Sequence, residues 1–425
     1  MIQALLSGVA SIKSQQSKMN VIGNNLANVN TTSYKGTRVT FEDMIAQTIR
    51  AASRPSVGKG GTNPYQLGLG TTISGTDSNN EQGALSATNR PTDIAIQGNG
   101  YFLIGDGYRV AYTRDGSFDI DSQGRMVHRA SGERLLGYSA ANDGTIDTSA
   151  SVTSESALTV PIGSLTATQA TTSMEFQGTL LSSASPVVPG VTTIRVYDQL
   201  GAPHDLTMRF DNRTVPPAGT PPPGAMASWE WSVSEGATVV GSSASPGNEL
   251  LYFDAAGALI NASSNGTVIV PGSSGTTPMT VSASFGKIAQ QAGDTSFVSA
   301  SQDGFPPGSL QGFGISVDGL VTGNYTNGLT RNLGQVAVAI FSNPGGLERL
   351  GSNTWRATEN SGTALHGVSG TGGRGSINAG FLEQSNVDIS SEFTDLIVTQ
   401  RGFQANTRVV TTVDEMLQEL LNMKR

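Results

Sequence analysis

The fold of this chain is decided by residues 2–29, whose sequence is IQALLSGVASIKSQQSKMNVIGNNLANV. The stretch has no proline, and its apolar residues recur in alternating steps of three and four, with Gln16 and Gly23 filling two of the slots. Such a repeat is the a/d stripe of a helix that packs in a coiled-coil seam. The stripe residues that we expect at a polymer interface are Leu5, Val9, Ile12, Met19 and Leu26.

The other end of the chain carries a matching pattern. Residues 389–424 also lack proline and repeat apolar residues at helical spacing, which predicts a second long helix of roughly 54 Å at 1.5 Å per residue. Its predicted interface residues are Phe393, Leu396, Phe403, Val410, Val413, Leu417 and Leu420. We therefore expect one helical seam, split between the two ends, in a building block that polymerises through them.

The sequence between the helices is expected to be β-rich. Around Gly98-Asn99-Gly100 and after Asp115-Gly116 the apolar period is two, which indicates hairpins. One short helix is expected from Phe41 to Arg50. The predicted organisation is a terminal helical polymerisation domain (1–33 and 388–425), linkers (34–75 and 371–387), an inner β domain (76–151 and 299–370) and an inserted outer β domain (152–298). The fold class is thus mainly β and multidomain, with long terminal helices pairing as a coiled-coil-like inner domain.

Composition excludes several function classes. The chain has 425 residues, of which only 14% are charged, compared with about 25% in typical soluble proteins. A net charge of −8 and scattered basic residues argue against nucleic-acid binding. The absence of cysteine excludes disulfides and thiolate chemistry. No apolar run is long enough to span a membrane, and the first residues lack the basic start of a cleavable signal peptide. We therefore expect no membrane-spanning helix and no cleavable signal peptide.

Candidate chemical sites are weak. The three histidines, His128, His204 and His366, lie far apart in the sequence. The segment beginning at Asp119 resembles a calcium loop, but Ala130 stands where the bidentate glutamate belongs. The glycine-rich segment 370–375 lacks the lysine of a phosphate-binding loop. We expect no catalytic, cofactor-binding or metal-binding residues.

The terminal stripes have a simpler alternative explanation, because an amphipathic helix usually packs on the core of its own domain. Two features argue against it here: each stripe is unusually long, and each is separated from the β body by a predicted linker. We expect each helix to bury its stripe against the other terminus or against another subunit.

Several motifs resemble those of the bacterial flagellar rod and hook proteins. Residues 25–35, NLANVNTTSYK, are similar to the N-terminal motif of that family, which usually has Gly-Phe where this chain has Ser33-Tyr34. Residues 94–102 (IAIQGNGYF) and 112–118 (YTRDGSF) are similar to its first β-domain motifs. Residues 385–388 and 400–406 are similar to its C-terminal motif.

Within the family, the resemblance to hook members is closer than to rod members. It includes residues 308–313 (GSLQGF), 333–337 (LGQVA), 343–347 (NPGGL) and, in the predicted insertion, 196–201 (VYDQLG), whereas residues 211–250 are not matched. The resemblance implies a structural subunit that self-assembles into the curved, tubular flagellar hook, a flexible universal joint that transmits torque from rod to filament.

The resemblance also implies partners and a location. The partners would be other copies of the chain, the distal rod protein, the hook cap protein, the hook–filament junction protein and the flagellar type III export apparatus, with no nucleic acid, cofactor or membrane insertion. The location would be extracellular, in the hook. Two alternatives stay open: a distal rod protein of the same family, against which the inserted domain argues, and a secreted β-rich enzyme acting on polysaccharide, which would need two facing carboxylates.

Overall fold

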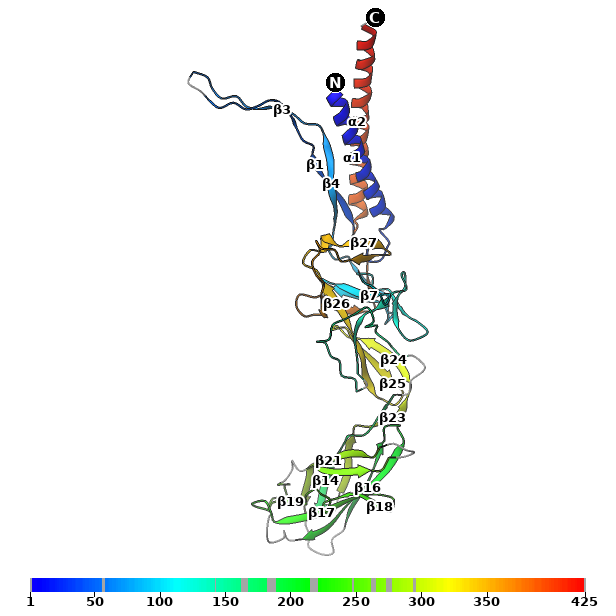
Figure 1. Cartoon of the computed structure of the whole chain (residues 1–425). Coiled ribbons are helices and arrows are strands. Elements are labelled where there is room, and N and C mark those ends of the chain that lie inside the picture. The colour runs from blue at the N-terminus through cyan, green and yellow to red at the C-terminus, as the bar shows by residue number, and fades with distance from the viewer. Residues whose placement is uncertain are drawn as a thin grey trace. The chain divides into compact units, whose positions relative to one another are not determined.

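The computed structural model describes residues 2–423 apart from 56–57, 142, 162–166, 182–188, 215–220, 247, 261–264, 273–276 and 293–295. Helices α1 (Ile2–Ala27) and α2 (Ile389–Met423) stand at the two ends and pack together (Figure 1). All other long elements are strands. The predicted fold class, a β-rich body with paired terminal helices, is confirmed.

The chain divides into two compact units. The first comprises Met1–Val160, Phe313–Thr322 and Asn332–Arg425, and the second comprises Pro161–Gly312 and Gly323–Arg331. The second unit therefore begins later than the predicted insertion 152–298, because the main chain at Leu158 still bonds to Leu135 and Met126 in the first unit.

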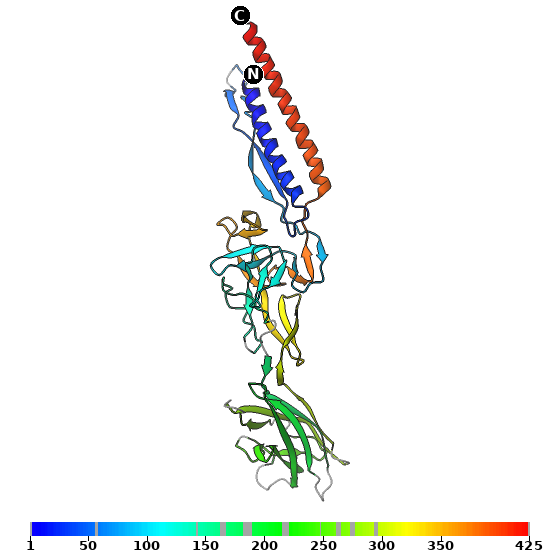
Figure 2. The same ribbon diagram turned by 90° about the vertical axis from the view of Figure 1, so that its right-hand side faces the viewer.

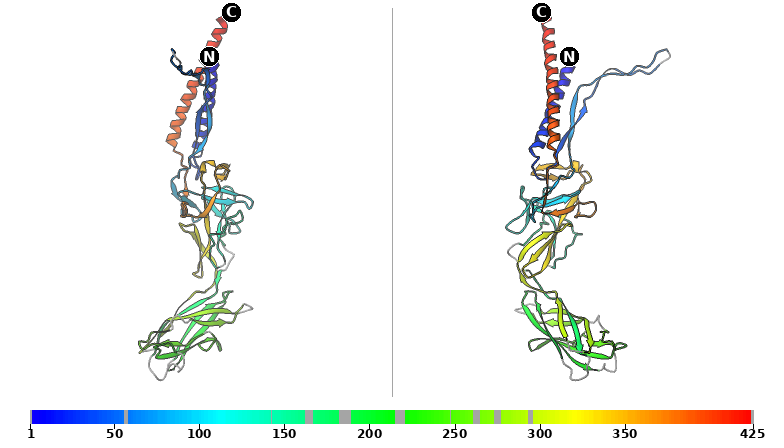
Figure 3. Two further views of the ribbon diagram at one scale, coloured as in Figure 1. Left: turned by 60° about the vertical axis from the view of Figure 1, so that its left-hand side comes forward. Right: turned by 180° about the vertical axis from the view of Figure 1, so that it is seen from behind.

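The first unit contains a long hairpin beside the terminal helices. Strand β1 (Thr37–Asp43) pairs antiparallel with β4 (Thr71–Ser78), and beyond them β2 (Gln47–Arg50) pairs with β3 (Tyr65–Leu67). Strands β1 and β4 lie beside α1 and pack against it (Figures 2 and 3), whereas the outer part with β2 and β3 bends away from the helices in the right view of Figure 3.

The hairpin corrects two sequence-based expectations. The helix predicted from Phe41 to Arg50 was wrong, because these residues belong to β1 and β2. Much of the predicted linker 34–75 is likewise paired strand. The partner strands lie far apart in the sequence, so local periodicity could not reveal their pairing.

The β domain of the first unit is built from many short strands. The bounds are β5 (Leu85–Ala87), β6 (Ile94–Gln97), β7 (Tyr101–Gly105), β8 (Val110–Thr113), β9 (Phe118–Ile120), β10 (Met126–His128), β11 (Arg134–Leu135), β12 (Gly137–Ser139), β24 (Leu310–Ile315), β25 (Leu320–Tyr325), β26 (Thr330–Ile340), β27 (Glu348–Gly351), β28 (Thr354–Arg356), β29 (Leu365–Val368), β30 (Ser376–Ala379) and β31 (Phe381–Glu383), with a short 3-10 turn at Pro344–Gly346.

Pairing in this domain joins distant parts of the chain. Strand β26 pairs with β7, β12 and β29, so the segments before and after the second unit share one sheet. Strands β30 and β31 pair with β6 and β5, so residues 376–383, within the predicted linker 371–387, are part of the sheet structure. A buried cluster that includes Tyr101, Tyr112, Phe341 and Trp355 forms the core.

The second unit has two larger sheets around one apolar core and a separate two-stranded sheet of β13 and β23. Its strands are β13 (Ala167–Gln169), β14 (Ser173–Leu181), β15 (Gly190–Tyr197), β16 (Pro203–Thr214), β17 (Ala227–Glu235), β18 (Thr238–Ser242), β19 (Leu251–Phe253), β20 (Gly266–Val270), β21 (Met279–Gln291), β22 (Ser296–Gln302) and β23 (Phe305–Gly308). The sheet order is β15-β16-β17-β18, with β19 on β17, and β20-β21-β14-β22. Phe176, Phe210, Trp231 and Phe285 from both sheets meet in this core.

Candidate assembly interface and its anchor

The two terminal helices pack antiparallel. Asn25 Nδ2 near the end of α1 donates to Glu392 Oε1 near the start of α2, at 2.9 Å. Further along, Asn406 Nδ2 donates to Ser11 Oγ at 2.6 Å. A Cβ on Gly8 would lie 3.1 Å from Val410 Cγ2, so the helices approach closely at that point. The residues of α1 that contact α2 thus lie one position before the predicted stripe.

The hairpin covers a second face of α1. Ser14 Oγ donates to the Thr71 carbonyl at 3.3 Å. Gly70, at φ +113°, packs closely beside Ser7 and Ala10, since an added Cβ would lie 3.3 Å from the Ala10 Cβ, a tight contact. Small side chains at every third or fourth position of α1 therefore allow the hairpin to approach the helix.

The third face of α1 carries the predicted apolar stripe. At 3.6 residues per turn, each position is about 100° from the next, so the stripe is centred away from both α2 and the hairpin. Its five residues are half-buried in the chain: Leu5, Val9, Ile12, Met19 and Leu26. The sequence left open whether another subunit or the other terminal helix covers this stripe. In the structure, α2 contacts a neighbouring face of α1, and the stripe is centred outside that contact.

Helix α2 presents a clearer seam. Its least exposed residues recur in steps of four and three, and those that the sequence predicted among them are Leu396, Phe403, Val410, Val413 and Leu417. Phe393 and Leu420, also predicted, are 48% and 49% exposed and belong to the outward side. Further apolar residues on the exposed surface of α2 are Ile397, Val398, Met416, Leu421 and Met423.

Period counting missed the polar members of the seam. Thr399 is buried, and its hydroxyl donates to the Asp395 carbonyl of its own helix at 2.6 Å. Asn406 and Ser11 satisfy each other across the seam. Ile22, only 4% exposed, was also missed because it falls outside the assumed apolar register. The sequence did carry one signal for these residues: Thr399 and Asn406 are seven residues apart, the same spacing as the apolar residues of the seam.

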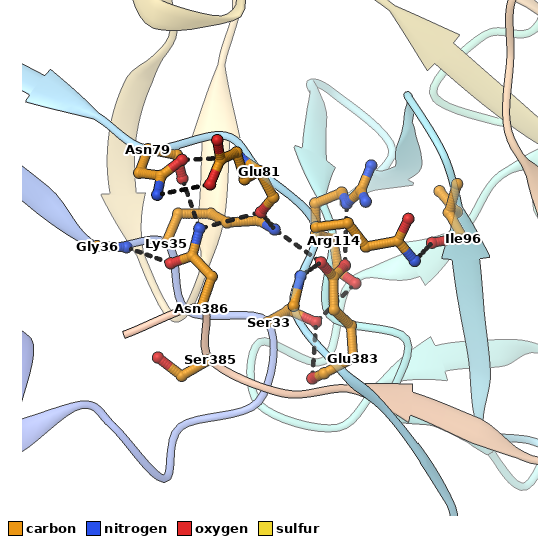
Figure 4. A network of polar contacts seen from close by, with 12 residues as sticks. Ser33, Lys35, Gly36, Asn79, Glu81, Ile96, Arg114, Glu383, Ser385 and Asn386 are labelled. Atoms are coloured by element: carbon orange, nitrogen blue, oxygen red, sulfur yellow. Dashed lines mark hydrogen bonds and ion pairs between the residues drawn. The ribbon is translucent and has the colours of Figure 1, made fainter. Parts of the chain in front are cut away.

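A buried ionic cluster anchors the base of this helical arm, which we define as α1, α2 and the β1–β4 hairpin (Figure 4). Lys35 Nζ lies 2.7 Å from Glu383 Oε1, and Arg114 Nε lies 3.0 Å from Glu383 Oε2. The side chain of Lys35 is 3% exposed, that of Arg114 is 5% exposed and that of Glu383 is 0% exposed. They come from the turn after α1, the turn after β8 and the end of β31.

Electrostatics in the cluster favour the ionised carboxylate. Burial alone would raise the pKa of Glu383, but the charges of Arg114 and Lys35 and the hydrogen bonds from Lys35 and the Gly83 N–H hold that pKa below its ordinary value. Burial lowers the pKa of Lys35, against the opposing effect of Glu383. A buried charge is tolerated here because each ion has partners.

The motif that resembles the flagellar family forms the turn into this cluster. Ser33 has φ 56°, in the left-handed region that glycine, the usual residue of the family motif, adopts without strain. Its N–H donates to the Glu383 carbonyl at 2.8 Å, and its hydroxyl donates to the Arg114 carbonyl at 2.9 Å. The Tyr34 hydroxyl donates to Asn25 Oδ1 at 3.2 Å, and the Arg349 guanidinium lies 5.2 Å from the Tyr34 ring centroid. The motif thus builds the anchor, a role that sequence spacing did not predict.

Other polar clusters give no catalytic arrangement in the described part of the chain. His128 contacts Asp115 Oδ2 at 3.2 Å and Ser131 Oγ at 2.9 Å, but the Ser131 hydroxyl donates to the Glu133 carboxylate and is not a free nucleophile. In the segment that resembles a calcium loop, the Asp121 carboxylate binds Arg125. Among the described residues, no cluster of three potential metal ligands exists, and no helix is long and apolar enough to cross a membrane.

Comparisons with known proteins agree on one family. Matching family models are described as flagella basal body rod protein (residues 5–35), flagellar hook protein FlgE/F/G D1 domain (95–175), flagellar basal body protein FlaE D2 domain (188–305) and flagellar basal body rod FlgEFG protein C-terminal (378–423). The flagellar hook protein FlgE of Borreliella burgdorferi is 36% identical over 464 residues, covering 100% of both chains. That of Treponema pallidum is 34% identical, again over 100% of both. The flagellar basal-body rod protein FlgG of Bacillus subtilis is 29% identical over 426 residues, with 100% of both chains covered.

Proposed function

Because this chain belongs to the flagellar hook protein family, we propose that it is the structural subunit that self-assembles into the curved, tubular hook, the flexible joint that transmits torque from rod to filament. The observation that carries the proposal is the uncovered apolar surface of the helical arm. The stripe of α1 is only half-buried, and α2 exposes residues such as Ile397 and Leu421 along its outward side. Further copies of the chain would cover these surfaces.

We propose that each predicted domain forms a different layer of the hook. The terminal helical domain (1–33 and 388–425) would form the inner tube, where every subunit buries its outward stripes against neighbours. The inner β domain (76–151 and 299–370) and the outer β domain (152–298) would form outer layers. The identity to hook proteins exceeds that to the rod protein, and the inserted domain has its own match to a hook-family domain, which favours the hook over the rod.

The partners, the export route and the location of the chain are also proposals. The partners would be the distal rod protein, the hook cap protein, the hook–filament junction protein and the flagellar type III export apparatus. The chain would be exported without a cleavable signal peptide and would work outside the cell, in the hook. Support for the junction with the rod comes from both ends of the chain, residues 5–35 and 378–423, which match models shared with rod proteins. We assign the chain no catalytic role, since its family is structural.

Electron microscopy of the purified chain in polymer-promoting salt tests the assembly proposal. The parent chain should form tubes, and Ile12→Asp should not, because a carboxylate on the outward stripe would be buried without a partner in the polymer. Asn20→Asp, on the exposed part of the same helix, is the matched control and should form tubes. Tubes formed equally by all three proteins would refute the use of this stripe.

A further inference from the structure

Three segments of the chain meet where the helical arm joins the β domain of the first unit (Figure 4). Residues 79–84 and 383–388 cross between the arm and the domain, and residues 28–36 form the loop that links α1 to β1 within the arm. Gly36 N–H donates to Asn386 Oδ1 at 2.9 Å, and Asn386 Nδ2 donates to the carbonyls of Asn79 and Glu81 at 2.9 and 3.0 Å. These contacts tie the loop and the two crossings to one another.

Glu383 ties the same segments to the β domain. Its Oε1 accepts from Lys35 Nζ in the loop 28–36, at 2.7 Å, and from the Gly83 N–H in the crossing 79–84, at 2.8 Å. Its Oε2 accepts from Arg114 Nε in the β domain, at 3.0 Å. Arg114 in turn donates to the carbonyls of Gly98 and Gly100, which fixes it in the sheet structure. One carboxylate therefore joins the loop of the arm, one crossing and the domain.

We propose that Glu383 is a positioning residue, which sets the direction of the helical arm relative to the β domain of the first unit. Without its negative charge, Lys35 and Arg114 would remain as two buried cations with no counter-ion. Burying unpaired cations is strongly unfavourable, whereas Lys35 reaches water if the loop 28–36 detaches from the β domain. The arm then swings about its two crossings while the sheets, which do not depend on Lys35, stay folded.

Glutamine is the informative substitution at this position. Glu383→Gln preserves size and one acceptor oxygen, but its amide nitrogen must face either Lys35 or Arg114, which are both donors. Glu392, at the start of α2 in the same arm, provides a matched control. It accepts one hydrogen bond from Asn25, and burial, assisted by nearby Asp395, raises its pKa. Glu392→Gln removes a charge that has no such set of partners and keeps the acceptor.

The absence of cysteine makes a distance measurement simple. Lys13→Cys on the exposed side of α1 and Tyr108→Cys, 93% exposed at the β7–β8 turn, would carry spin labels in the monomeric chain. Pulsed electron paramagnetic resonance should give one narrow distance distribution in the labelled parent and in Glu392→Gln. Glu383→Gln should lose the narrow peak at temperatures where slow hydrogen exchange of β7 and β26 shows that the β domain is folded. This readout does not depend on tube formation, so it stands apart from the assembly proposal.

Each other outcome would overturn the proposal. A narrow peak in Glu383→Gln with a lowered melting temperature would make Glu383 a stabilising residue only. A broad distribution in the parent would mean that the arm direction is not set in the chain. If Glu383→Gln does not fold, Lys35→Met replaces it, since this variant keeps the Arg114–Glu383 pair and removes only the bond between Glu383 and the loop 28–36. Methionine leaves no buried cation, but it cannot bond the carboxylate, so a positioning role for that bond requires that Lys35→Met also broaden the distance distribution. A peak as narrow as in the parent would refute the positioning role.

Discussion

Replacing Asn25 with aspartate gives the sharpest test of how the arm is held. Asn25 is 2% exposed, and its amide nitrogen donates to the Thr37 carbonyl at 2.7 Å and to Glu392 Oε1 at 2.9 Å. Its oxygen accepts from the Thr37 N–H at 3.0 Å and from the Tyr34 hydroxyl at 3.2 Å. Asn25→Asp keeps the shape and the accepting oxygen, removes both donated bonds and places a second carboxylate beside Glu392.

The magnitude follows from two contributions. Losing a bond to a charged acceptor and one to a carbonyl costs about 2–4 kcal/mol in net stability. Two carboxylates about 4 Å apart repel by roughly 4 kcal/mol at an effective dielectric constant near 20, and by about 1 kcal/mol in bulk water. The pair can avoid the larger repulsion by binding one proton, which costs about 3 kcal/mol at pH 7 for a carboxyl of ordinary pKa 4.5 and so limits this contribution to about 1–3 kcal/mol. The arm should therefore lose about 3–7 kcal/mol at pH 7.

The pH dependence has a definite sign. In the variant, the repulsion raises the folded-state pKa of the pair above its unfolded value. The folded arm then gains relative stability as pH falls through that raised pKa, and a loss of about 2–4 kcal/mol, from the missing hydrogen bonds, should remain at pH 4.5. Hydrogen exchange of residues 28–37 at both pH values measures the effect without requiring global two-state unfolding.

The control for this experiment is Asn20→Asp, an exposed site on the same helix where exchange should be unchanged. The reasoning fails if Asn25→Asp exchanges like the control at pH 7, or if its defect grows as the solution is acidified. Either result would mean that Asn25 does not join α1 to α2 and the hairpin.

Four further predictions follow from single contacts. Ser33→Gly should be about 1 kcal/mol more stable than Ser33→Ala, because both lose the hydroxyl but only glycine adopts φ 56° without strain; denaturant titration checks this. Gly70→Val should detach the hairpin from α1, since φ +113° is strained for a β-branched residue and its Cβ would crowd Ser7 and Ala10, and limited proteolysis should then cut within 37–78. Because the pKa of Glu383 is lowered, its contribution is present above the ordinary value of 4.5 and is lost as pH falls through the folded pKa, which exchange at residues 33–36 should follow. Val413→Asp should loosen the arm in the monomer, whereas Leu421→Asp, at a side chain 70% exposed, should leave monomer exchange unchanged and block tubes.

Local periodicity predicted the helices and the β-rich class well. Residues 2–29 and 389–424 were expected, and the helices are Ile2–Ala27 and Ile389–Met423. The β1–β4 hairpin was missed because its pairing joins strands that no short window contains, and because its mostly exposed residues carry little apolar pattern. The buried partners Lys35, Arg114 and Glu383 were missed for a related reason. A buried charge has no local signature, and its partners lie in three distant parts of the sequence.

The predicted interface shows what an apolar stripe can and cannot identify. Periodicity reveals that Ile12 and Met19 share a face of α1, but it does not say which surface covers that face. Within the chain, α1 approaches α2 closely at Gly8, and Ser11 and Asn25 fix the register by hydrogen bonds. Polar pairs in a helical seam specify register at some cost in stability. If the subunit polymerises as we propose, the apolar stripe of α1 would serve contacts between copies, whereas these small and polar residues serve contacts within the chain. The proposal would then account for a stripe that the sequence reveals and a position relative to α2 that it does not.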